Sequence, residues 1–319
     1  MSEPRPSIGV LITYYGEREL LRECLESIAS QSVPPDEVLI YDDASEAPAE
    51  TYVPAGFPAR ILRAEVNRGP SVGRNALLQA SESTYVHFHD ADDLFDPEWC
   101  ARVRQVIEAR AVDAVFTEIL SRGPNGLVIE RVLGLQRMSA GLDLVRFCIR
   151  GVMLTQAGTY HRQAVLAIGG YRTDLWQSED YDFHIRLAAH GIRYELITEP
   201  LVIQRLRPGA RHFKWLEVWG SYLQAVERLS DELAAHYWPD LADAAARAGS
   251  ALFQLGARDQ ARRAFALAGR IGPPRFSTQR RFYQLLSRAV GFEMTERLAQ
   301  AYRSLLPLGF RAYFATRGW

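Results

Sequence analysis

The first two thirds of the chain alternate short apolar runs with amphipathic segments. Ile8–Thr13 is apolar and rich in β-branched residues, which predicts a strand, and residues 17–31 repeat apolar side chains at helical spacing, which predicts a helix. After the Pro34-Pro35 break the alternation continues, with strands predicted over 37–41, 60–64, 84–88 and 114–118 and helices over 71–80 and 97–110. This alternation predicts an α/β fold, a mostly parallel sheet flanked by helices.

The last third of the chain has a different pattern, because from about Trp215 onward the apolar spacing is helical throughout. Charge changes at the same point: residues 1–214 carry 23 basic and 29 acidic side chains, whereas residues 215–319 carry 14 and 9. We therefore expect two parts, 1–214 and an all-helical region over 215–319. The whole chain has a formal charge of -1, which offers no general basic surface for nucleic acid and favours a small-molecule partner.

Three widely spaced cysteines, Cys24, Cys100 and Cys148, indicate neither a disulfide framework nor a zinc site. The start of the chain is polar, the apolar run at 8–12 is too short for a signal peptide, and no run of about 18 apolar residues occurs. These features predict a cytoplasmic protein that is soluble or lies at the inner face of the cell membrane.

Polar residues follow three of the predicted strands directly: Thr13-Tyr14, Asp42-Asp43 and the acidic run at 90–93. The carboxyl ends of parallel strands meet at one edge of a sheet, where α/β proteins bind their ligands. We therefore expect these side chains to surround one site.

The run Asp90-Ala91-Asp92 places two carboxylates two residues apart, directly after a strand. Crowded carboxylates are favourable beside a hard cation, so the pair suits Mg²⁺ or Mn²⁺ bound to a diphosphate. A solvated acidic turn before the next helix is the alternative. The neighbouring motifs favour the metal site.

Two further motifs belong to the expected site. Asp42 and Asp43 could accept hydrogen bonds from a uracil N–H or a ribose hydroxyl, or they could close an ordinary turn. The loop over 67–75 enters a helix with two glycines and with Arg74, whose planar guanidinium suits a base or a phosphate. The sequence contains no Walker or dinucleotide-binding glycine pattern.

Four blocks of sequence, in this order, resemble the inverting glycosyltransferases of family 2, which have the Rossmann-like GT-A fold. The blocks are IGVLITYYGERELLRECLESIASQSVPPDEVLIYDDAS, NRGPSVGRNALLQA, YVHFHDADDLFDPEWC and LAIGGYRTDLWQSEDYDFHIRLAAHG, and they span roughly residues 7–210. The resemblance implies a GT-A catalytic domain over 1–214, with a nucleotide-sugar part at about 7–118 and an acceptor part at about 119–214.

The resemblance also implies roles for single residues. Thr13, Tyr14, Asp43 and Arg74 would surround the nucleoside, Asp90 would lie near the ribose and the metal, Asp92 would bind the metal on the donor diphosphate, and Asp180 would be the general base. Sugar transfer needs a group that stabilises the departing diphosphate and a carboxylate that takes the acceptor proton. Asp92 and Asp180 can fill these roles.

The segment around Glu179 offers candidates for the acceptor site. Trp176 could stack on a sugar ring, and Glu179 lies beside the implied base. The acidic run over 179–182 is also consistent with a plain helix start, because acids favour the N-terminal end of the helix dipole. His212, in the loop over 205–214, is a candidate third metal ligand or an ordinary surface histidine.

Residues 275–319 carry eight arginines and two acids, interspersed with aromatic and leucine side chains. Basic helices with an apolar face can bind anionic lipid, so a peripheral membrane contact is one interpretation. Packing of these helices on the catalytic domain, or on another subunit of a homo-oligomer, is the alternative.

The sequence therefore predicts a metal-dependent, inverting glycosyltransferase. It would move a sugar from a nucleotide-diphosphate donor, with a UDP-sugar favoured, to a hydroxyl of a saccharide or a lipid-linked saccharide in bacterial surface polysaccharide or glycoconjugate synthesis. Sugar-phosphate nucleotidyl transfer is an alternative, although the first strand lacks the glycine-rich basic loop that it needs. A non-catalytic, transferase-like scaffold with a helical interaction region is another.

Overall fold

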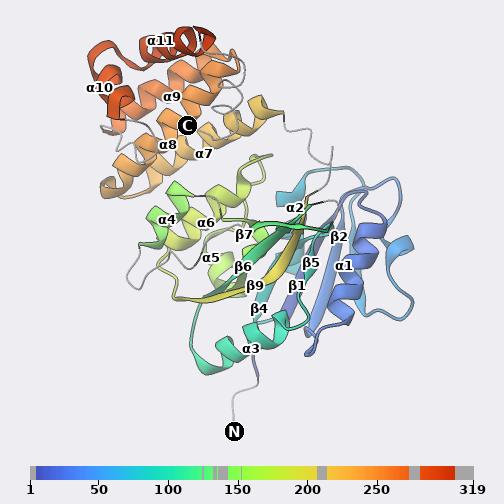
Figure 1. Cartoon of the computed structure of the whole chain (residues 1–319). Coiled ribbons are helices and arrows are strands. Elements are labelled where there is room, and N and C mark those ends of the chain that lie inside the picture. Colours follow the sequence, from blue (N-terminus) through green and yellow to red (C-terminus); the bar gives the residue numbers. More distant parts are fainter. Residues whose placement is uncertain are drawn as a thin grey trace. The chain divides into compact units, whose positions relative to one another are not determined.

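The computed structural model describes residues 5–123, 126–131, 135, 143–151, 153–206, 214–272 and 281–305. The chain divides into two compact units, residues 1–212 and 213–319 (Figure 1).

The N-terminal unit is built on a nine-stranded sheet in the order β3-β2-β1-β4-β8-β6-β9-β5, with β7 paired to β6 (Figure 1). The strands are β1 Ile8–Tyr14, β2 Glu37–Asp42, β3 Ala59–Arg63, β4 Tyr85–Asp90, β5 Leu94–Phe95, β6 Ala114–Arg122, β7 Val128–Arg131, β8 Gly158–His161 and β9 Tyr194–Arg205. The predicted α/β fold class is confirmed.

The sheet is parallel in its first half and mixed in its second. Strands β3, β2, β1 and β4 are parallel, whereas β8 is antiparallel to both of its neighbours, β4 and β6. β6 and β9 are parallel, and β5 and β7 are antiparallel to their partners. The sequence predicted a mostly parallel sheet. It does not reveal the reversal because β8 is only four residues long, too short to show a hydrophobic period.

Six helices flank the sheet in the described part of this unit: α1 Glu19–Ala29, α2 Pro70–Ala80, α3 Trp99–Ala109, α4 Leu144–Arg150, α5 Arg162–Ala167 and α6 Glu179–Ala189. Short 3₁₀ helices cover Ala49–Tyr52 and Thr155–Ala157. Strand β1 is covered on both faces, so nearly all of its residues are buried. This explains why its sequence is continuously apolar instead of alternating.

The C-terminal unit is helical wherever it is described. Its helices are α7 Trp215–Glu232, α8 Trp238–Gln254, α9 Arg258–Ile271, α10 Arg281–Val290 and α11 Phe292–Leu305, with a 3₁₀ turn at Ala235–Tyr237. Helices α8 and α9 form a hairpin around Gly256, whose φ of +83° suits glycine. Gly249 of α8 faces Phe265 of α9 so closely that a Cβ at this position would lie 2.5 Å from the phenylalanine ring.

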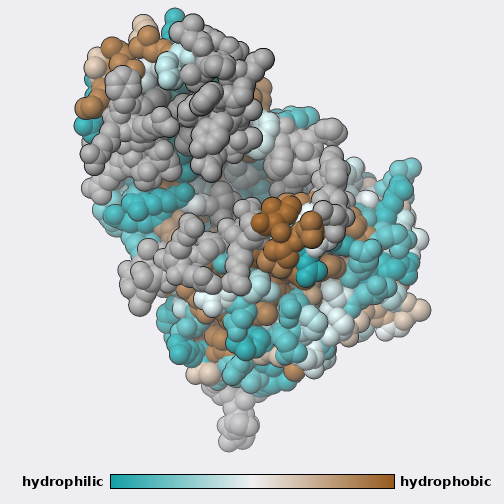
Figure 2. Space-filling view, viewed as in Figure 1, coloured by the Kyte–Doolittle hydropathy of each residue, from teal (hydrophilic) through white to brown (hydrophobic). Residues whose placement is uncertain are grey.

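Apolar side chains remain exposed on the last two helices. Figure 2 shows brown, hydrophobic residues over α10 and α11, where Leu285, Met294, Leu298 and Tyr302 are all exposed. Within the described ranges, the helices are too short or too polar to cross a membrane.

The contact between α8 and α9 gives a testable expectation for stability. Gly249→Ala is expected to lower the free energy of unfolding by about 1–3 kcal/mol, because the new methyl group overlaps the packed Phe265 ring. The matched control is Gly269→Ala in α9, where a Cβ meets no atom within 4 Å. This change should raise stability by about 0.5–1 kcal/mol through helix propensity. Urea unfolding followed by circular dichroism measures both, and equal effects would contradict the packing argument.

Candidate active site

Three strand ends lie side by side in the sheet and bring the predicted motifs together. In the register of β1 with its neighbours, Thr13 lies opposite Asp90 of β4, and Tyr14 lies opposite Asp42 of β2. The backbone N–H of Asp43 donates to the Tyr14 carbonyl at 3.0 Å, which continues this pairing beyond the strands. The three motifs therefore meet at one edge of the sheet.

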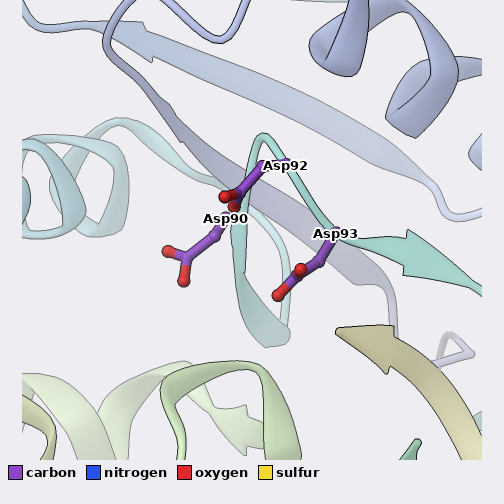
Figure 3. A group of neighbouring side chains, drawn as sticks. All are labelled: Asp90, Asp92 and Asp93. Atoms are coloured by element: carbon purple, nitrogen blue, oxygen red, sulfur yellow. The ribbon is translucent and has the colours of Figure 1, made fainter. Parts of the chain in front are cut away.

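Three carboxylates gather where β4 turns toward β5 (Figure 3). Oxygens of Asp90, Asp92 and Asp93 all lie within 4.8 Å of one another. Asp93 is buried, and its two oxygens accept hydrogen bonds from Gln156 Nε2 at 2.7 Å and from the Arg205 backbone N–H at 2.9 Å. Burial, and then the charges of Asp92 and Asp90, raise the pKa of Asp93 well above its ordinary value. Asp93 therefore shapes the turn, while Asp90 and Asp92 stay partly exposed.

This oxygen-donor set fits a hard divalent cation such as Mg²⁺ or Mn²⁺. A cation would offset the repulsion that is visible in the raised pKa of Asp93. Asp90 and Asp92 are the residues that could hold it, because both oxygens of Asp93 already accept hydrogen bonds from the protein. His212, the candidate third ligand, lies outside the described residues.

Two residues beside the acidic turn have no local sequence signal that identifies them. Arg205, at the end of β9 and 113 residues from Asp92, donates from Nε to the Asp92 carbonyl and from Nη2 to the Leu20 carbonyl at 3.0 Å. Glu17, in the loop after β1, has a raised pKa because it is buried and because the charges of Asp92 and Asp90 act on it. Both were missed because only the tertiary fold brings them to the turn.

Asp43 shapes the loop that enters α2. Its two oxygens accept hydrogen bonds from the backbone N–H groups of Arg68 at 2.9 Å and Gly69 at 2.8 Å. Gly73, in the first turn of α2, lies against the Tyr41 ring, where a Cβ would be only 2.6 Å from a ring carbon. Glycine at this position lets α2 approach the ends of the strands closely.

Two residues predicted to contact the nucleoside have their side chains in the interior. Tyr14 is 1% exposed, and its hydroxyl donates to the Ala47 carbonyl at 2.8 Å. Asp42 is fully buried and accepts hydrogen bonds from Arg63 Nη1 at 2.6 Å and from two backbone N–H groups of the following loop. Because side chains alternate along a strand, Tyr14 points away from the face that Thr13 occupies. The Tyr14 and Asp42 side chains thus stabilise the loop after β2, and their predicted contact with the nucleoside stays a prediction.

Arg74, also predicted to contact the nucleoside, is buried between two carboxylates. Its Nη2 donates to Asp90 Oδ1 at 3.0 Å and its Nη1 donates to Glu179 Oε1 at 2.8 Å. Burial alone would lower the pKa of Arg74, but the charges of Asp90 and Glu179 raise it above the ordinary value. The guanidinium therefore links the acidic turn to the start of α6.

Asp180 lies next to this link, in the first turn of α6. Burial, and then the charge of Glu179, raise the pKa of Asp180 to about 7, although the charge of Arg74 and the Tyr181 N–H act in the opposite direction. A carboxyl with a pKa near neutrality is suited to take up a proton from a hydroxyl and later release it. The structure thus brings the implied base within electrostatic reach of Asp90, whose charge also raises this pKa.

Trp176 stands on the segment that precedes α6 and is 58% exposed. The ring lies against Gly69, where a Cβ would be 3.2 Å from a ring carbon. The indole therefore borders the loop that enters α2, and its predicted contact with a sugar stays a prediction.

Comparison with known proteins identifies the family. Residues 9–166 match the family described as Glycosyl transferase family 2. This chain therefore contains a glycosyltransferase family 2 domain. An uncharacterized glycosyltransferase of Haemophilus influenzae is 27% identical in sequence to this chain over 194 residues, which are 56% of this chain. The match spans 61% of that relative's length. Family 2 membership favours sugar transfer over nucleotidyl transfer.

Two solved structures have the same GT-A fold as this chain. TarS 1-349 of S. aureus, in complex with UDP-GlcNAc, has a TM-score of 0.68 and 18% identity, covering 93% of this chain and 92% of TarS 1-349. Mannosyltransferase PcManGT from Pyrobaculum calidifontis, in complex with GDP-Man and Mn²⁺, has a TM-score of 0.58 and 19% identity, covering 94% of this chain and 85% of PcManGT. At these identities the likeness shows the fold.

The two kinds of aspartate in this site can be separated by their effect on stability. Asp42→Asn is expected to lower the free energy of unfolding by about 1–3 kcal/mol, because Arg63 and two buried backbone N–H groups lose the carboxylate that accepts their hydrogen bonds. Asp92→Asn should leave stability unchanged or raise it, since it removes one of three crowded charges. Urea unfolding with EDTA present measures both variants. A greater loss for Asp92→Asn would contradict this division.

Proposed function

We propose that this chain is an inverting, metal-dependent glycosyltransferase that transfers a sugar from a nucleotide-diphosphate donor to a hydroxyl acceptor. The observation that carries the proposal is the link from Asp90 through Arg74 to Glu179. It joins an acidic, cation-compatible turn to a helix start that holds Asp180, a carboxyl with a near-neutral pKa. Family 2 membership supports the same reaction class.

The donor would bind at the edge formed by β1, β2 and β4. The candidates for contact with the nucleoside are the polar residues that end β1 and β2, namely Thr13, Tyr14, Asp42 and Asp43. Arg74 acts through Asp90. Asp90 and Asp92 would hold Mn²⁺ or Mg²⁺, which would stabilise the negative charge of the leaving diphosphate. A UDP-sugar is the favoured donor; TarS, whose fold this chain shares, forms a complex with UDP-GlcNAc.

Asp180 would be the general base. In its ionised form it accepts the proton of the acceptor hydroxyl while the oxygen attacks the anomeric carbon from the face opposite the leaving diphosphate. Attack from that face inverts the configuration of this carbon. Glu179, paired with Arg74, and the exposed Trp176 border the same region and are the candidates for contact with the acceptor.

The acceptor class in this proposal is a saccharide or a lipid-linked saccharide of a bacterial surface polysaccharide or glycoconjugate. Exposed Leu285, Leu298 and Tyr302 on α10 and α11, together with Arg288 in the last turn of α10, support a peripheral contact with anionic lipid, where such acceptors are held. A second copy of the chain could cover the same helices instead.

Donor use and metal dependence can be measured before the acceptor is known. The full chain is incubated with UDP-, GDP- and dTDP-sugars, and release of the nucleoside diphosphate to water is followed with Mn²⁺ and with EDTA. We expect release of UDP that requires the metal and is lost in Asp92→Asn. The control is Glu199→Gln, an exposed acid on β9 that pairs with Arg102. Equal turnover with EDTA would contradict metal dependence, and no turnover with any donor would favour a non-catalytic scaffold.

Asp180→Asn tests the assignment of the base. We expect turnover to fall by about 10²–10⁴-fold while UDP affinity is retained, because the amide cannot take up the proton. In the wild type, kcat should rise with pH through about 7, as Asp180 loses its proton, and this rise should be absent from the residual activity of the variant. A variant that loses UDP binding but keeps transfer would contradict the assignment.

A stability measurement on the same variant needs no substrate. The pKa of Asp180 in the folded state lies above its ordinary value, so folding is weakened as pH rises and the buried carboxyl ionises. Asp180→Asn is neutral at every pH, so its gain in Tm over the wild type should be larger at pH 8 than at pH 5. An equal gain at both values would show that Asp180 does not titrate in this range.

A further inference from the structure

Two consecutive residues of α2, Arg74 and Asn75, bind a segment about 100 residues further along the chain. Asn75 Nδ2 donates to the Tyr171 carbonyl at 2.7 Å, and the Tyr171 N–H donates back to Asn75 Oδ1 at 2.8 Å. The side-chain amide of Asn75 thus makes the same two hydrogen bonds with residue 171 that a paired strand residue would make. It fixes the backbone of residue 171 to α2.

The neighbouring glycine shows how closely the two segments approach. Gly170 has a φ of +68°, and a Cβ at this position would lie 2.4 Å from Asn75 Oδ1. A side chain there would therefore push Asn75 away and would also strain the backbone. Glycine at position 170 allows the amide of Asn75 to reach the chain.

Arg74 makes the second connection between the same two regions. Its side chain is 5% exposed and its guanidinium carbon lies 5.1 Å from the centre of the Tyr171 ring, in a cation–π arrangement. The two nitrogens that bind Asp90 and Glu179 belong to one planar guanidinium. A displacement of this group that changes the hydrogen bond to Asp90 therefore also changes the hydrogen bond to Glu179.

We propose that Arg74 and Asn75 are positioning residues that fasten the segment over 169–180 to the donor-binding half, and that occupation of Asp90 is transmitted through Arg74 to Glu179. The inference rests on the proposed function, because it takes Asp90 to be where the donor and its cation bind. A cation at Asp90 competes with Arg74 for the same carboxylate and weakens the Arg74–Asp90 ion pair. The ion pair between Arg74 and Glu179 then becomes stronger. Binding of the donor and its cation therefore stabilises the first turn of α6.

Hydrogen exchange of the full chain, read by mass spectrometry, tests this transmission with UDP and Mn²⁺ as the probe. In the wild type, the probe should slow exchange both in peptides over 85–93 and in peptides over 169–182. Arg74→Lys keeps the positive charge but cannot bind two carboxylates with one planar fork. At saturating UDP, this variant should show slowing over 85–93 alone. Arg102→Lys, which alters an exposed arginine paired with Glu199, is the matched control and should behave as the wild type.

Asn75→Asp provides a milder variant that leaves Arg74 in place. It keeps an acceptor for the Tyr171 N–H but loses the donor to the Tyr171 carbonyl. Without nucleotide, exchange over 169–182 should become about 3- to 10-fold faster, the equivalent of one lost hydrogen bond, while exchange over 85–93 stays unchanged.

The outcomes separate this inference from the proposed function. Slowing over 85–93 together with equal slowing over 169–182 in wild type and Arg74→Lys would overturn the transmission and leave the donor site standing. Unchanged exchange over 169–182 in Asn75→Asp would overturn the fastening role of Asn75. If UDP, GDP and dTDP with Mn²⁺ all fail to slow exchange over 85–93 in the wild type, the proposed function fails and the transmission falls with it.

Discussion

A buried guanidinium, that of Arg74, balances carboxylates from two regions that are far apart in sequence. Asp90 ends β4, Glu179 begins α6, and the arginine lies between them with little exposure to water. Acids placed this close in a poorly solvated site are stable only when a cation or hydrogen-bond donors offset their charge. The gathering of acids at this edge of the sheet depends on that pairing, and so does the position of the helix that carries Asp180.

Aspartates that look equivalent in sequence have different tasks in the fold. Asp42 and Asp43 accept hydrogen bonds from backbone N–H groups of loops, and Asp93 accepts one from Arg205 at the end of β9. All three aspartates are buried. Asp90 and Asp92 remain accessible beside them. The buried acids fix the loops so that the accessible acids keep a defined geometry, which is the usual support for an ion or phosphate site.

Local pattern was sufficient for the elements that build the donor edge. The helix predicted over 71–80 is Pro70–Ala80, and the strand predicted over 84–88 is Tyr85–Asp90. The convergence of the strand ends followed from topology rules. Local pattern could not decide which of two adjacent polar residues has a buried side chain: Thr13 stays partly exposed, whereas the Tyr14 side chain is buried in the core. It also could not reveal Arg205 or the reversed strand β8, because their partners are distant in sequence and only the completed fold brings them together.

The two-residue strand β5, directly after the acidic turn, has consequences for assembly of the protein during synthesis. Among the described residues its strand partner is β9, where Leu94 lies opposite Ile203 and Phe95 opposite Val202. A chain emerging from the ribosome can pair β1 with β2 and β4 early, but the partners of β5, Val202 and Ile203, are made only after more than 100 further residues have been added. Such distant pairing carries a high loop-closure cost and forms late. The pairing of β5 and the contacts of Arg205 with the acidic turn are therefore completed only after β9 has been synthesised.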